Sequence, residues 1–414
     1  MAHNVLFIHQ NFPGQYKLLA ETLASNDRFN VVAIGQRQPF AEDLKHLHYI
    51  GYSFGPAEIP DLFPPLLFFS EQVRRAGIVR TRLIDLKQRG FAPDVCFVHP
   101  GWGDALFLRD VFPDTRLIAY LEHYYTARGA DLDFDPEFHG PATDLDFVSL
   151  RNLPILQAAA VADVLISPTA WQASRFPEAL RQRIDIVHEG IDTHVATPGP
   201  AGPHRLSDGR RIEPGGTLIT YVSRSLEPYR GFHTFMRALP SLLERLPDAH
   251  VALVGGPHPS YGRSPAGGGT WKDRLLAEVG SRIDHERVHF LGRVPYDDLV
   301  NLFRLSTIHV YLTYPFVLSW SLIDAMACGC AIVASDTAPV REVIQDGRNG
   351  VLTDFFDAEA LADRIASLAE NEIERQRLSV GARATAVESY DFRTATLPRY
   401  AALLEQLLES SGAA

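Results

Sequence analysis

Short apolar runs alternate with longer amphipathic segments along almost the whole chain, and this alternation constrains the possible folds more than any other feature. Each run is four to eight residues long and rich in Val, Ile, Leu and aromatic residues, and most runs are apolar on both faces. Parallel strands that are covered by helices on both sides have this pattern. We therefore predict strands at Asn4–His9, Asn30–Gly35, Val95–His99, Leu117–Glu122, Val164–Thr169, Asp185–Gly190, Leu218–Ser223, His250–Gly255, Val288–Arg293, Ile308–Thr313, Ala331–Asp336 and Gly350–Phe355.

The segments between these runs, such as Tyr16–Leu23 and Leu299–Leu305, repeat apolar residues every three or four positions, as amphipathic helices do. Strands and helices that alternate in this way build βαβ units. The predicted fold class is therefore α/β, with two Rossmann-like, doubly wound parallel-sheet domains facing a cleft.

The domain boundaries follow from one break in the alternation, where Pro and Gly residues are concentrated. We expect a first domain over residues 1–198, a Pro/Gly-rich linker over 199–216 and a second domain over 217–390. The tail, 391–414, has the apolar spacing of a helix, which could pack back on the first domain.

The composition excludes several classes of protein. Of 414 residues, 46% are hydrophobic, which supports sizeable cores and excludes a disordered chain. With 39 Lys and Arg against 50 Asp and Glu, the net charge of −11 argues against a nucleic-acid partner. No apolar stretch approaches the ~20 residues of a transmembrane span, although a peripheral membrane contact stays open. Three Cys and no recognisable signal peptide suggest a reducing cytoplasm. The oligomeric state is not indicated.

Two arginines flank a Pro-containing turn that follows a predicted strand in the second domain. Arg224 and Arg230 stand six residues apart, with Glu227 between them, and a helical pattern begins at Phe232. Guanidinium donors at the carboxyl end of a strand, beside a helix N-terminus, suit the oxygens of a phosphate. The alternative is that one or both arginines are solvated or paired with Glu227.

A second segment with polar residues at a helix start follows the predicted strand Ile308–Thr313. Ser319 and Ser321 lie in the first turn of the expected helix, and Asp324 lies early in it, where a carboxylate is favoured by the helix dipole. Simple capping is the alternative, and these residues by themselves favour it. The loop Gly255–Gly269, rich in Gly and Pro, reads either as a mobile surface loop or as a flap over a ligand.

Taken together, these segments resemble a known family. The second half of the chain contains the series Arg224…Glu227-Pro228…Arg230-Gly231, Asp324-Ala325-Met326-Ala327-Cys328-Gly329 and Ala334-Ser335-Asp336…Glu342. This series looks like the donor-binding half of family-four glycosyltransferases. The order and spacing hold across about 218–390, and the first half is similar more weakly. The resemblance implies the two-Rossmann GT-B fold, retention of anomeric configuration and a nucleotide-diphosphate sugar as donor, with no added cofactor and no metal.

The resemblance also implies roles for individual residues. Arg224 and Arg230, the latter in place of the family's Lys, would neutralise the donor diphosphate, and Asp324 would hold the donor ribose. Gly14 fits the close-approach glycine of the first domain, and Arg293 and Val294 match a segment that contacts the nucleobase through its backbone. The remaining donor-binding positions, which face the sugar or the β-phosphate, are Val317, Leu318, Ser319, Ser321 and Leu322. The chain departs from the family at Phe316, where an acid usually binds donor-sugar hydroxyls, so an unusual or deoxygenated donor sugar becomes plausible.

In the first domain, Glu122 and His123 end a strand at the position of a polar site residue in the family. A strand sends neighbouring side chains to opposite sides, so one of them is expected to face the ligand, and we favour Glu122 over His123. A packed or surface histidine is the alternative for His123.

The acidic run Asp131, Asp133 and Asp135 could bind a divalent ion. The arginine pair already supplies the positive charge that a leaving diphosphate needs, so a solvated loop or an acceptor contact is favoured.

The sequence thus predicts a metal-independent retaining glycosyltransferase that moves a sugar from a nucleotide-diphosphate donor to an unidentified acceptor. Arg224, Arg230 and one of Glu122 and His123 would form the catalytic site. Two alternatives share the architecture: a nucleotide-sugar epimerase or phosphorylase, and a catalytically silent sugar-binding subunit.

Overall fold

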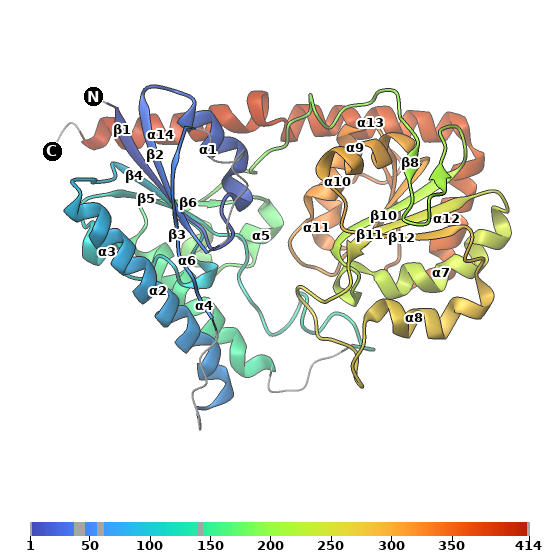
Figure 1. Ribbon diagram of the computed structural model, residues 1–414, viewed down its shortest axis with the longest axis horizontal. Helices are drawn as coiled ribbons and strands as arrows, with labels where there is room; N and C mark the ends of the chain where they lie inside the picture. Colours follow the sequence, from blue (N-terminus) through green and yellow to red (C-terminus); the bar gives the residue numbers. More distant parts are fainter. Residues whose placement is uncertain (1, 37–45, 56–61, 139–143, 412–414) are drawn as a thin grey trace. The chain divides into compact units, whose positions relative to one another are not determined.

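The computed structural model describes residues 2–36, 46–55, 62–138 and 144–411, and it divides into two compact units (Figure 1). The first unit comprises Met1–Arg128, His139–Gly190 and Phe392–Ala414, and the second comprises Gly129–Phe138 and Ile191–Asp391. Each unit contains a parallel sheet with helices on both faces, so the predicted α/β fold class with two Rossmann-like domains is confirmed.

The sheet of the first unit has seven parallel strands. Their spatial order is β3 (His48–Gly51), β2 (Phe29–Gly35), β1 (His3–Ile8), β4 (Val95–Val98), β5 (Arg116–Tyr120), β6 (Val164–Ser167) and β7 (Ile184–Ile186). All six strands predicted in this half are present. The edge strand β3 was missed because it is short and at most half-buried, so it lacks the apolar run that marks the other strands.

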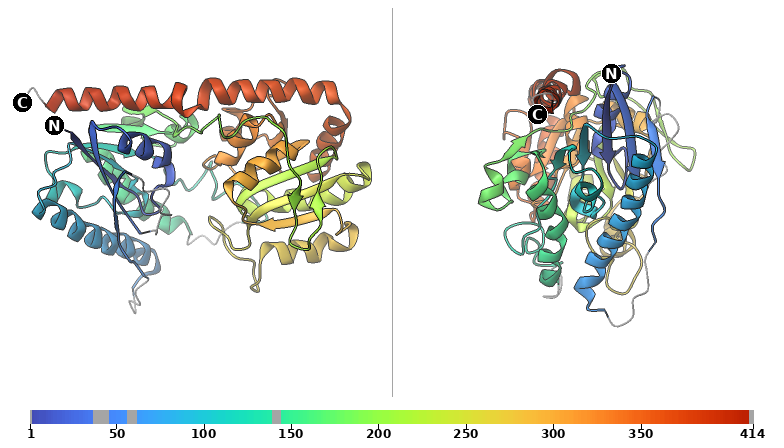
Figure 2. Two further views of the ribbon diagram at one scale, coloured as in Figure 1. Left: turned by 45° about the horizontal axis from the view of Figure 1, so that its top comes forward. Right: turned by 90° about the vertical axis from the view of Figure 1, so that its left-hand side faces the viewer.

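Alternate side chains of this sheet enter two separate cores, as the period of two in a strand requires. One core, with Phe7 and Phe97, is covered by α1 (Lys17–Ala24) and by α14 (Leu397–Ser411), which is seen lengthwise in the left view of Figure 2. The other is covered by α2 (Pro64–Gln88), α3 (Leu108–Val111) and α4 (Asp144–Val161). Short helices at the strand ends complete the unit: η1 (Gly14–Tyr16), η3 (Pro100–Trp102), α5 (Ala170–Ser174) and α6 (Glu178–Arg181).

The sheet of the second unit has six parallel strands. Their order is β12 (Val288–Gly292), β11 (His250–Gly256), β10 (Leu218–Ser225), β13 (Ile308–Tyr311), β14 (Ala331–Ser335) and β15 (Val351–Thr353), and all six were predicted. One face is covered by α7 (Phe232–Arg245), α8 (Trp271–Val279) and α12 (Ala358–Glu370). The other is covered by α9 (Tyr296–Leu305), α10 (Trp320–Ala327) and α13 (Glu372–Tyr390). The helices η4 (Pro228–Arg230), η5 (Gly280–Arg282) and α11 (Ala338–Arg341) lie between these elements in the chain, and η6 (Phe392–Thr396) follows α13.

Two segments differ from the predicted layout. The stretch read as a linker contains an antiparallel hairpin, β8 (His204–Arg205) and β9 (Arg211–Ile212), whose Leu206 and Ile212 pack against Leu218 at the start of β10. The segment Gly129–Phe138, which the sequence placed in the first domain, belongs to the second unit. Both segments are polar or Pro/Gly-rich, so periodicity gave no sign that they pack on a core.

The topology indicates where a ligand would bind in each unit. In the first unit β1 lies between β2 and β4, and in the second β10 lies between β11 and β13, so the chain reverses direction across the sheet at these strands. Doubly wound sheets bind ligands at the carboxyl ends of the strands at such switch points. The ends of β1 and β4, and of β10 and β13, are therefore the places to examine.

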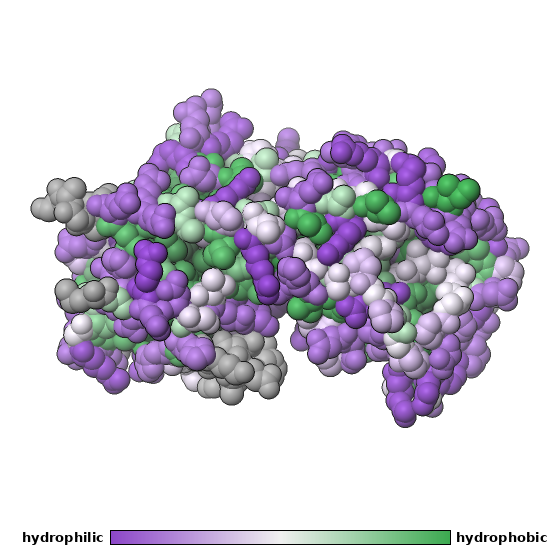
Figure 3. Space-filling view, turned by 90° about the horizontal axis from the view of Figure 1, so that it is seen from above, coloured by the Kyte–Doolittle hydropathy of each residue, from purple (hydrophilic) through white to green (hydrophobic). Residues whose placement is uncertain are grey.

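The molecular surface is mixed rather than dominated by one kind of side chain. On the face drawn in Figure 3, hydrophilic residues cover most of the area and hydrophobic ones lie between them. In the part of the chain that the structure describes, no helix is both long and apolar enough to span a bilayer.

Candidate functional site

Two arginines lie at the carboxyl edge of the second unit's sheet. Arg224, near the end of β10, has an exposed side chain between the buried Ser223 and Ser225. Arg293, which follows β12, is also exposed, and its guanidinium group lies against Gly256 at the end of β11. A Cβ at Gly256 would approach Arg293 Nε to 3.0 Å and the Arg224 carbonyl oxygen to 3.3 Å. The sequence assigned Arg293 a backbone role only, whereas the structure brings its guanidinium group to the end of the neighbouring strand.

Arg230 is placed differently from Arg224. It is only 3% exposed, and its Nη1 donates hydrogen bonds to Thr313 Oγ1 and to the carbonyl oxygen of Val317, both at 2.8 Å. Its guanidinium carbon lies 5.1 Å from the centre of the Tyr261 ring and 5.7 Å from that of Phe316. Arg230 therefore ties the turn after β13 to η4, beneath two aromatic rings.

Phe316 occupies the position where the resemblance led us to look for an acid. It is 6% exposed and packs edge-on against Tyr229, 5.6 Å away, and against Tyr261, 5.0 Å away. The turn after β13 is therefore an aromatic cluster, and Phe316 brings no carboxylate to it.

Glu227 holds the Gly/Pro-rich loop. The side chain is fully buried, and its carboxylate accepts hydrogen bonds from the amides of Ser260 (2.9 Å), Tyr261 (3.2 Å) and Gly262 (2.7 Å). The indole of Trp271 also donates to the Arg263 carbonyl at 2.8 Å. The loop read as either mobile or flap-like is thus anchored at its centre. Sequence reasoning considered Glu227 only as a partner of the arginines and missed this role.

Simple capping describes the start of α10. Ser319 is the N-cap, and its amide donates to the Tyr311 hydroxyl at 2.8 Å. The amide of Ser321 donates to Ser319 Oγ at 3.4 Å, and that of Leu322 donates to the Ser319 carbonyl at 3.2 Å. These three amides are engaged within the chain, and the expectation that this segment faces a ligand stays a prediction. Leu322 is fully buried in the core, and Leu318 and Val294 pack against the same core.

Asp324 is a buried carboxylate with one identified partner. It is 5% exposed, and the hydroxyl of Tyr296, at the start of α9, donates to its Oδ1 at 3.0 Å. Burial raises the pKa of Asp324 to about 7, although the bond from Tyr296 opposes this rise. Sequence reasoning missed Tyr296, whose ring is 45% exposed beside this carboxylate.

The raised pKa of Asp324 leads to a stability prediction. The folded state binds a proton at Asp324 more tightly than the unfolded chain, whose carboxyl has a pKa of 3.8. This contribution to stability is complete below pH ~4 and is lost as the pH rises to ~7. The uncharged Asp324→Asn variant should therefore unfold about 3–6 °C above the wild type at pH 8 and at nearly the same temperature at pH 4. Thermal denaturation at both pH values measures this, and a lower Tm for the variant at pH 8 would contradict it.

The first unit carries a hydrogen-bonded polar network at the ends of β1, β4 and β5. The amide of Asn11 donates to His9 Nδ1 at 2.9 Å, and His9 Nε2 lies 2.7 Å from Gln15 Oε1. Gln15 Nε2 donates to Glu122 Oε1 at 2.5 Å, and Glu122 Oε2 lies 3.1 Å from His99 Nε2. His9, Gln15 and His99 were missed, although His9 and His99 are the last residues of two predicted strands and directly follow β1 and β4 in the structure.

Glu122 and His123 lie just beyond the end of β5 and differ in exposure. The Glu122 side chain is 29% exposed, whereas His123 is 6% exposed and packs edge-on against Tyr125, with ring centres 4.9 Å apart. Burial alone would raise the pKa of Glu122, but its hydrogen bonds with His99 and Gln15 lower it to about 2. Of the two residues, Glu122 offers an ionised group to a ligand.

Gly14 is required by a neighbour within the chain. Its φ is +48°, and a Cβ there would lie 2.6 Å from His9 Cε1. The glycine therefore makes room for the ring of His9, and the close approach to a ligand that the resemblance implies for Gly14 stays a prediction.

The acidic run is mostly buried, so of the two favoured interpretations, a solvated loop and an acceptor contact, the solvated loop is wrong for two of its members. Asp131 is 5% exposed and accepts from the Tyr229 hydroxyl at 3.0 Å, and Asp135 is 4% exposed. Asp133 is exposed and accepts from the amide of Gly129 at 2.9 Å. Over the described ranges, no group of three or more His, Cys, Asp or Glu residues has the geometry of a metal site.

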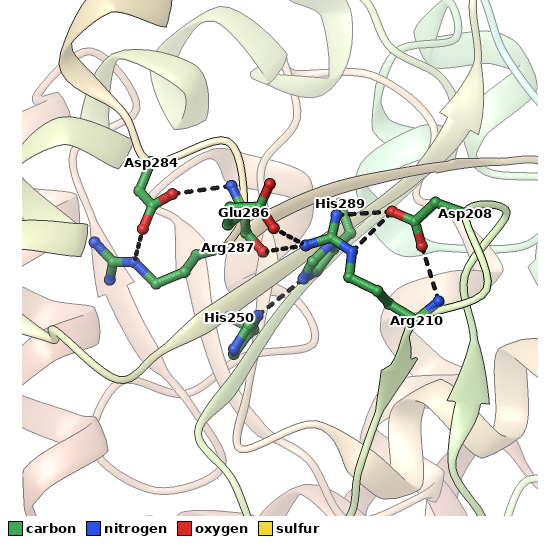
Figure 4. Close-up of polar contacts among 7 residues, drawn as sticks. All are labelled: Asp208, Arg210, His250, Asp284, Glu286, Arg287 and His289. Atoms are coloured by element: carbon green, nitrogen blue, oxygen red, sulfur yellow. Dashed lines mark hydrogen bonds and ion pairs between the residues drawn. The ribbon is translucent and has the colours of Figure 1, made fainter.

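A further polar cluster lies at the opposite, amino-terminal end of the second sheet (Figure 4). His250, the first residue of β11, and His289, the second of β12, stack with His250 Nδ1 2.9 Å from His289 Nε2. Burial lowers the pKa of His289 to about 4, and the neighbouring His250 is the second cause of this shift. Arg210 nearby pairs with Asp208 and Glu286. This cluster lies at the opposite end of the sheet from the carboxyl end of β10, which carries Arg224.

Comparison with known sequences covers both units. Residues 27–196 match the family described as "Glycosyl transferase family 4 group", and residues 207–385 match "Glycosyl transferases group 1". A D-inositol 3-phosphate glycosyltransferase of Mycobacterium sp. (strain KMS) is 30% identical over 222 residues, covering 53% of this chain and 47% of the relative. A phosphatidyl-myo-inositol mannosyltransferase of Mycobacterium leprae is 32% identical over 206 residues, covering 49% and 48%. The chain thus spans about half the length of the curated relatives it matches.

Solved structures extend the likeness to the whole fold. Sucrose-phosphate synthase from Thermosynechococcus elongatus superposes with a TM-score of 0.73 at 16% identity, covering 99% of this chain and 100% of the other. Anabaena Alr3699/HepE in complex with UDP-glucose gives 0.67 at 17% identity, with coverage of 99% and 100%. These structures share the fold, and the two family matches, which together account for most of both units, show that the chain belongs to the family-four glycosyltransferases.

Proposed function

We propose that this chain is a glycosyltransferase that moves a sugar from a nucleotide-diphosphate donor to a hydroxyl-bearing acceptor with retention of configuration. The observation that carries the proposal is the pair of exposed arginines, Arg224 and Arg293, at the carboxyl edge of the second unit's sheet, where Arg224 ends the switch-point strand β10. The relatives named as glycosyltransferases and the HepE complex with UDP-glucose support it.

The donor chemistry follows from charge. Breaking the bond between sugar and diphosphate leaves positive charge on the sugar ring and adds negative charge to the departing diphosphate. Arg224, assisted by Arg293, would stabilise that anion by charge-assisted hydrogen bonds. Arg230, buried beneath Tyr261 and Phe316, would contribute its charge from behind and hold the turn in place. These guanidinium groups supply the positive charge that a metal ion would otherwise bring to the diphosphate.

Asp324 would bind the donor ribose. A ribose hydroxyl can donate to its carboxylate, and Tyr296 already orients one oxygen of that group. Because Phe316 offers no carboxylate to the donor sugar, the sugar would be selected by apolar contact and backbone groups. An unusual or deoxygenated sugar suits such a turn.

The acceptor would meet the first unit at Glu122. With a pKa of about 2, Glu122 is ionised at neutral pH and is a poor base, so it would bind an acceptor hydroxyl rather than remove its proton. In a front-face retaining mechanism that proton passes to the departing diphosphate, and no protein base is needed.

A thermal-shift screen of nucleotides and nucleotide sugars in the absence of divalent ions tests this function. We expect one nucleoside diphosphate and its sugar conjugates to raise Tm, by about 2–6 °C at a concentration near 100 times Kd. Addition of EDTA should leave the shift unchanged. If no nucleotide shifts Tm, the proposed activity is wrong and the silent-subunit alternative is favoured. Turnover of a stabilising donor without any acceptor would favour an epimerase.

A further inference from the structure

The segment Gly129–Phe138, here called the arm, belongs to the second unit although the chain on both sides of it belongs to the first. Glu137 pairs with Arg237 of α7 through two hydrogen bonds of 2.6 and 2.8 Å, and Phe138 packs edge-on against Trp271, with ring centres 4.9 Å apart. Phe134 lies 5.2 Å from the ring of Tyr314 and 5.1 Å from that of Phe355. Ion pairs and aromatic packing thus fasten the arm to its unit at several points.

Asp135 is the most buried carboxylate of the arm, at 4% exposure, and its partners lie in different elements. Its Oδ2 accepts a hydrogen bond of 2.6 Å from the Tyr314 hydroxyl and lies 3.2 Å from His233 Nε2 of α7. Its Oδ1 accepts from the amide of Glu137 at 2.9 Å. These bonds together hold the pKa of Asp135 below its usual value, against the effect of burial. Oδ2 therefore joins the arm to Tyr314 and α7, whereas Oδ1 is used within the arm.

Tyr314 connects this carboxylate to the donor site. It lies between Thr313, which accepts from Arg230, and Phe316, which covers Arg230. Its amide donates to the Tyr229 carbonyl at 3.0 Å, beside Arg230 in η4. The turn is thus held by Arg230 on one side and by Asp135, through the Tyr314 ring, on the other. The ring is 3% exposed, so its hydroxyl depends on a partner within the protein.

We propose that Asp135 is a positioning residue of the donor site: through Tyr314 it holds the turn that carries Phe316 and Val317 in register with Arg230. This role rests on the proposed function, because the turn matters to catalysis only if the donor binds there. A segment from the first half of the sequence then sets the geometry of the donor site in the second half. Asp135 touches neither donor nor acceptor.

The test uses the full-length chain, with Asp135→Asn as the variant and Asp133→Asn as its matched control on the same arm. The amide of Asn keeps the shape of the side chain but removes the charge that Tyr314 and His233 bind. We expect Asp135→Asn to weaken UDP binding and to raise the donor KM about tenfold, with kcat and the acceptor KM within about twofold of the wild type. Asp133→Asn should leave all four values unchanged.

Tyr314→Phe completes the test because it removes the same hydrogen bond from the other side. The double variant should bind UDP no more weakly than either single variant, since both changes break one contact. Hydrogen exchange of the amides of residues 313–319 should be faster in Asp135→Asn than in the Asp133→Asn control.

The outcomes separate the two proposals. If Arg224→Ala lowers UDP affinity but Asp135→Asn changes neither affinity nor exchange in the turn, the positioning role is wrong. A fall in Tm with unchanged donor KM likewise assigns Asp135 to stability alone and overturns it. If UDP and every other nucleotide fail to bind the wild type, the proposed function is wrong. Hydrogen exchange then still tests the contact itself: faster exchange of residues 313–319 in Asp135→Asn supports the coupling of Asp135 to the turn, and unchanged exchange overturns it.

Discussion

Replacing Arg224 by alanine is expected to lower kcat/KM for the donor by about 10²–10³-fold, the usual cost of removing a charged donor that stabilises a leaving anion. The side chain is exposed at the carboxyl edge of the sheet, so its loss should leave the fold intact. Steady-state kinetics with the donor identified by thermal shift measure the effect, and circular dichroism and Tm report on the fold.

Arg282, exposed in η5 of the same unit, provides the matched control. Arg282→Ala removes an equal charge from the same unit, so it corrects for the change in overall field. If both variants keep rates within threefold of the wild type, Arg224 does not bind the diphosphate. A matched loss in both would mean that the general charge of the unit, rather than one contact, governs the rate.

Arg230 is the wrong position for the same experiment. Its guanidinium group is buried and tied to Thr313 and Val317, so alanine would leave these acceptors without their donor. Leaving a buried acceptor without its donor typically costs about 1–3 kcal/mol. Loss of activity in Arg230→Ala would therefore follow from damage to the turn as readily as from weaker donor binding.

The sequence predicted the strands well because their apolar runs are local signals. Every strand whose residues are buried on both faces was found from its composition, and β3 escaped because it is a half-exposed edge strand. The arm and the hairpin β8–β9 escaped for a different reason. Their packing depends on a few side chains, such as Phe134 and Ile212, that meet a distant part of the chain.

The candidate site was predicted where residues are adjacent in sequence and missed where contacts are distant. Arg224, Arg230 and Asp324 were found through motif spacing. Their partners could not be found in this way, because pairs such as Tyr296 with Asp324 and Tyr314 with Asp135 are 28 and 179 residues apart. Spacing predicts which residues end a strand, whereas the direction of each side chain depends on the packing around it. Arg230 is the clearest case, since its motif is that of a ligand-binding residue and its side chain is buried.

The second large effect is expected at Glu122. Glu122→Gln should reduce glycosyl transfer about 100-fold, mainly through a higher acceptor KM, while UDP binding stays within about twofold of the wild type. Transfer to acceptor and binding of UDP are measured separately on the same preparation. Glu178, exposed in α6 of the same unit, gives the matched control Glu178→Gln, which should behave as the wild type.

The size of this effect follows from the direction of the hydrogen bonds around Glu122. Burial, and to a smaller extent the nearby His99, lowers the pKa of His9 to about 3, so its ring is neutral. Because the amide of Asn11 donates to His9 Nδ1, the ring carries its proton on Nε2. His9 then donates to Gln15 Oε1, which leaves Gln15 Nε2 to donate to Glu122. His99 approaches the other carboxylate oxygen, so both oxygens of residue 122 must accept. A glutamine there would direct an amide donor at another donor.

The pH dependence separates this role from base catalysis. The lowered pKa of Glu122 adds stability that is present above the unfolded value of 4.5 and is lost as the pH falls through about 2. Glu122 is therefore ionised throughout pH 5–8, and its hydrogen bond to the acceptor should give no acid limb in the profile of kcat/KM for the acceptor. An acid limb in that range that disappears in Glu122→Gln would mean that Glu122 titrates as a base, and the binding role assigned to it would be wrong.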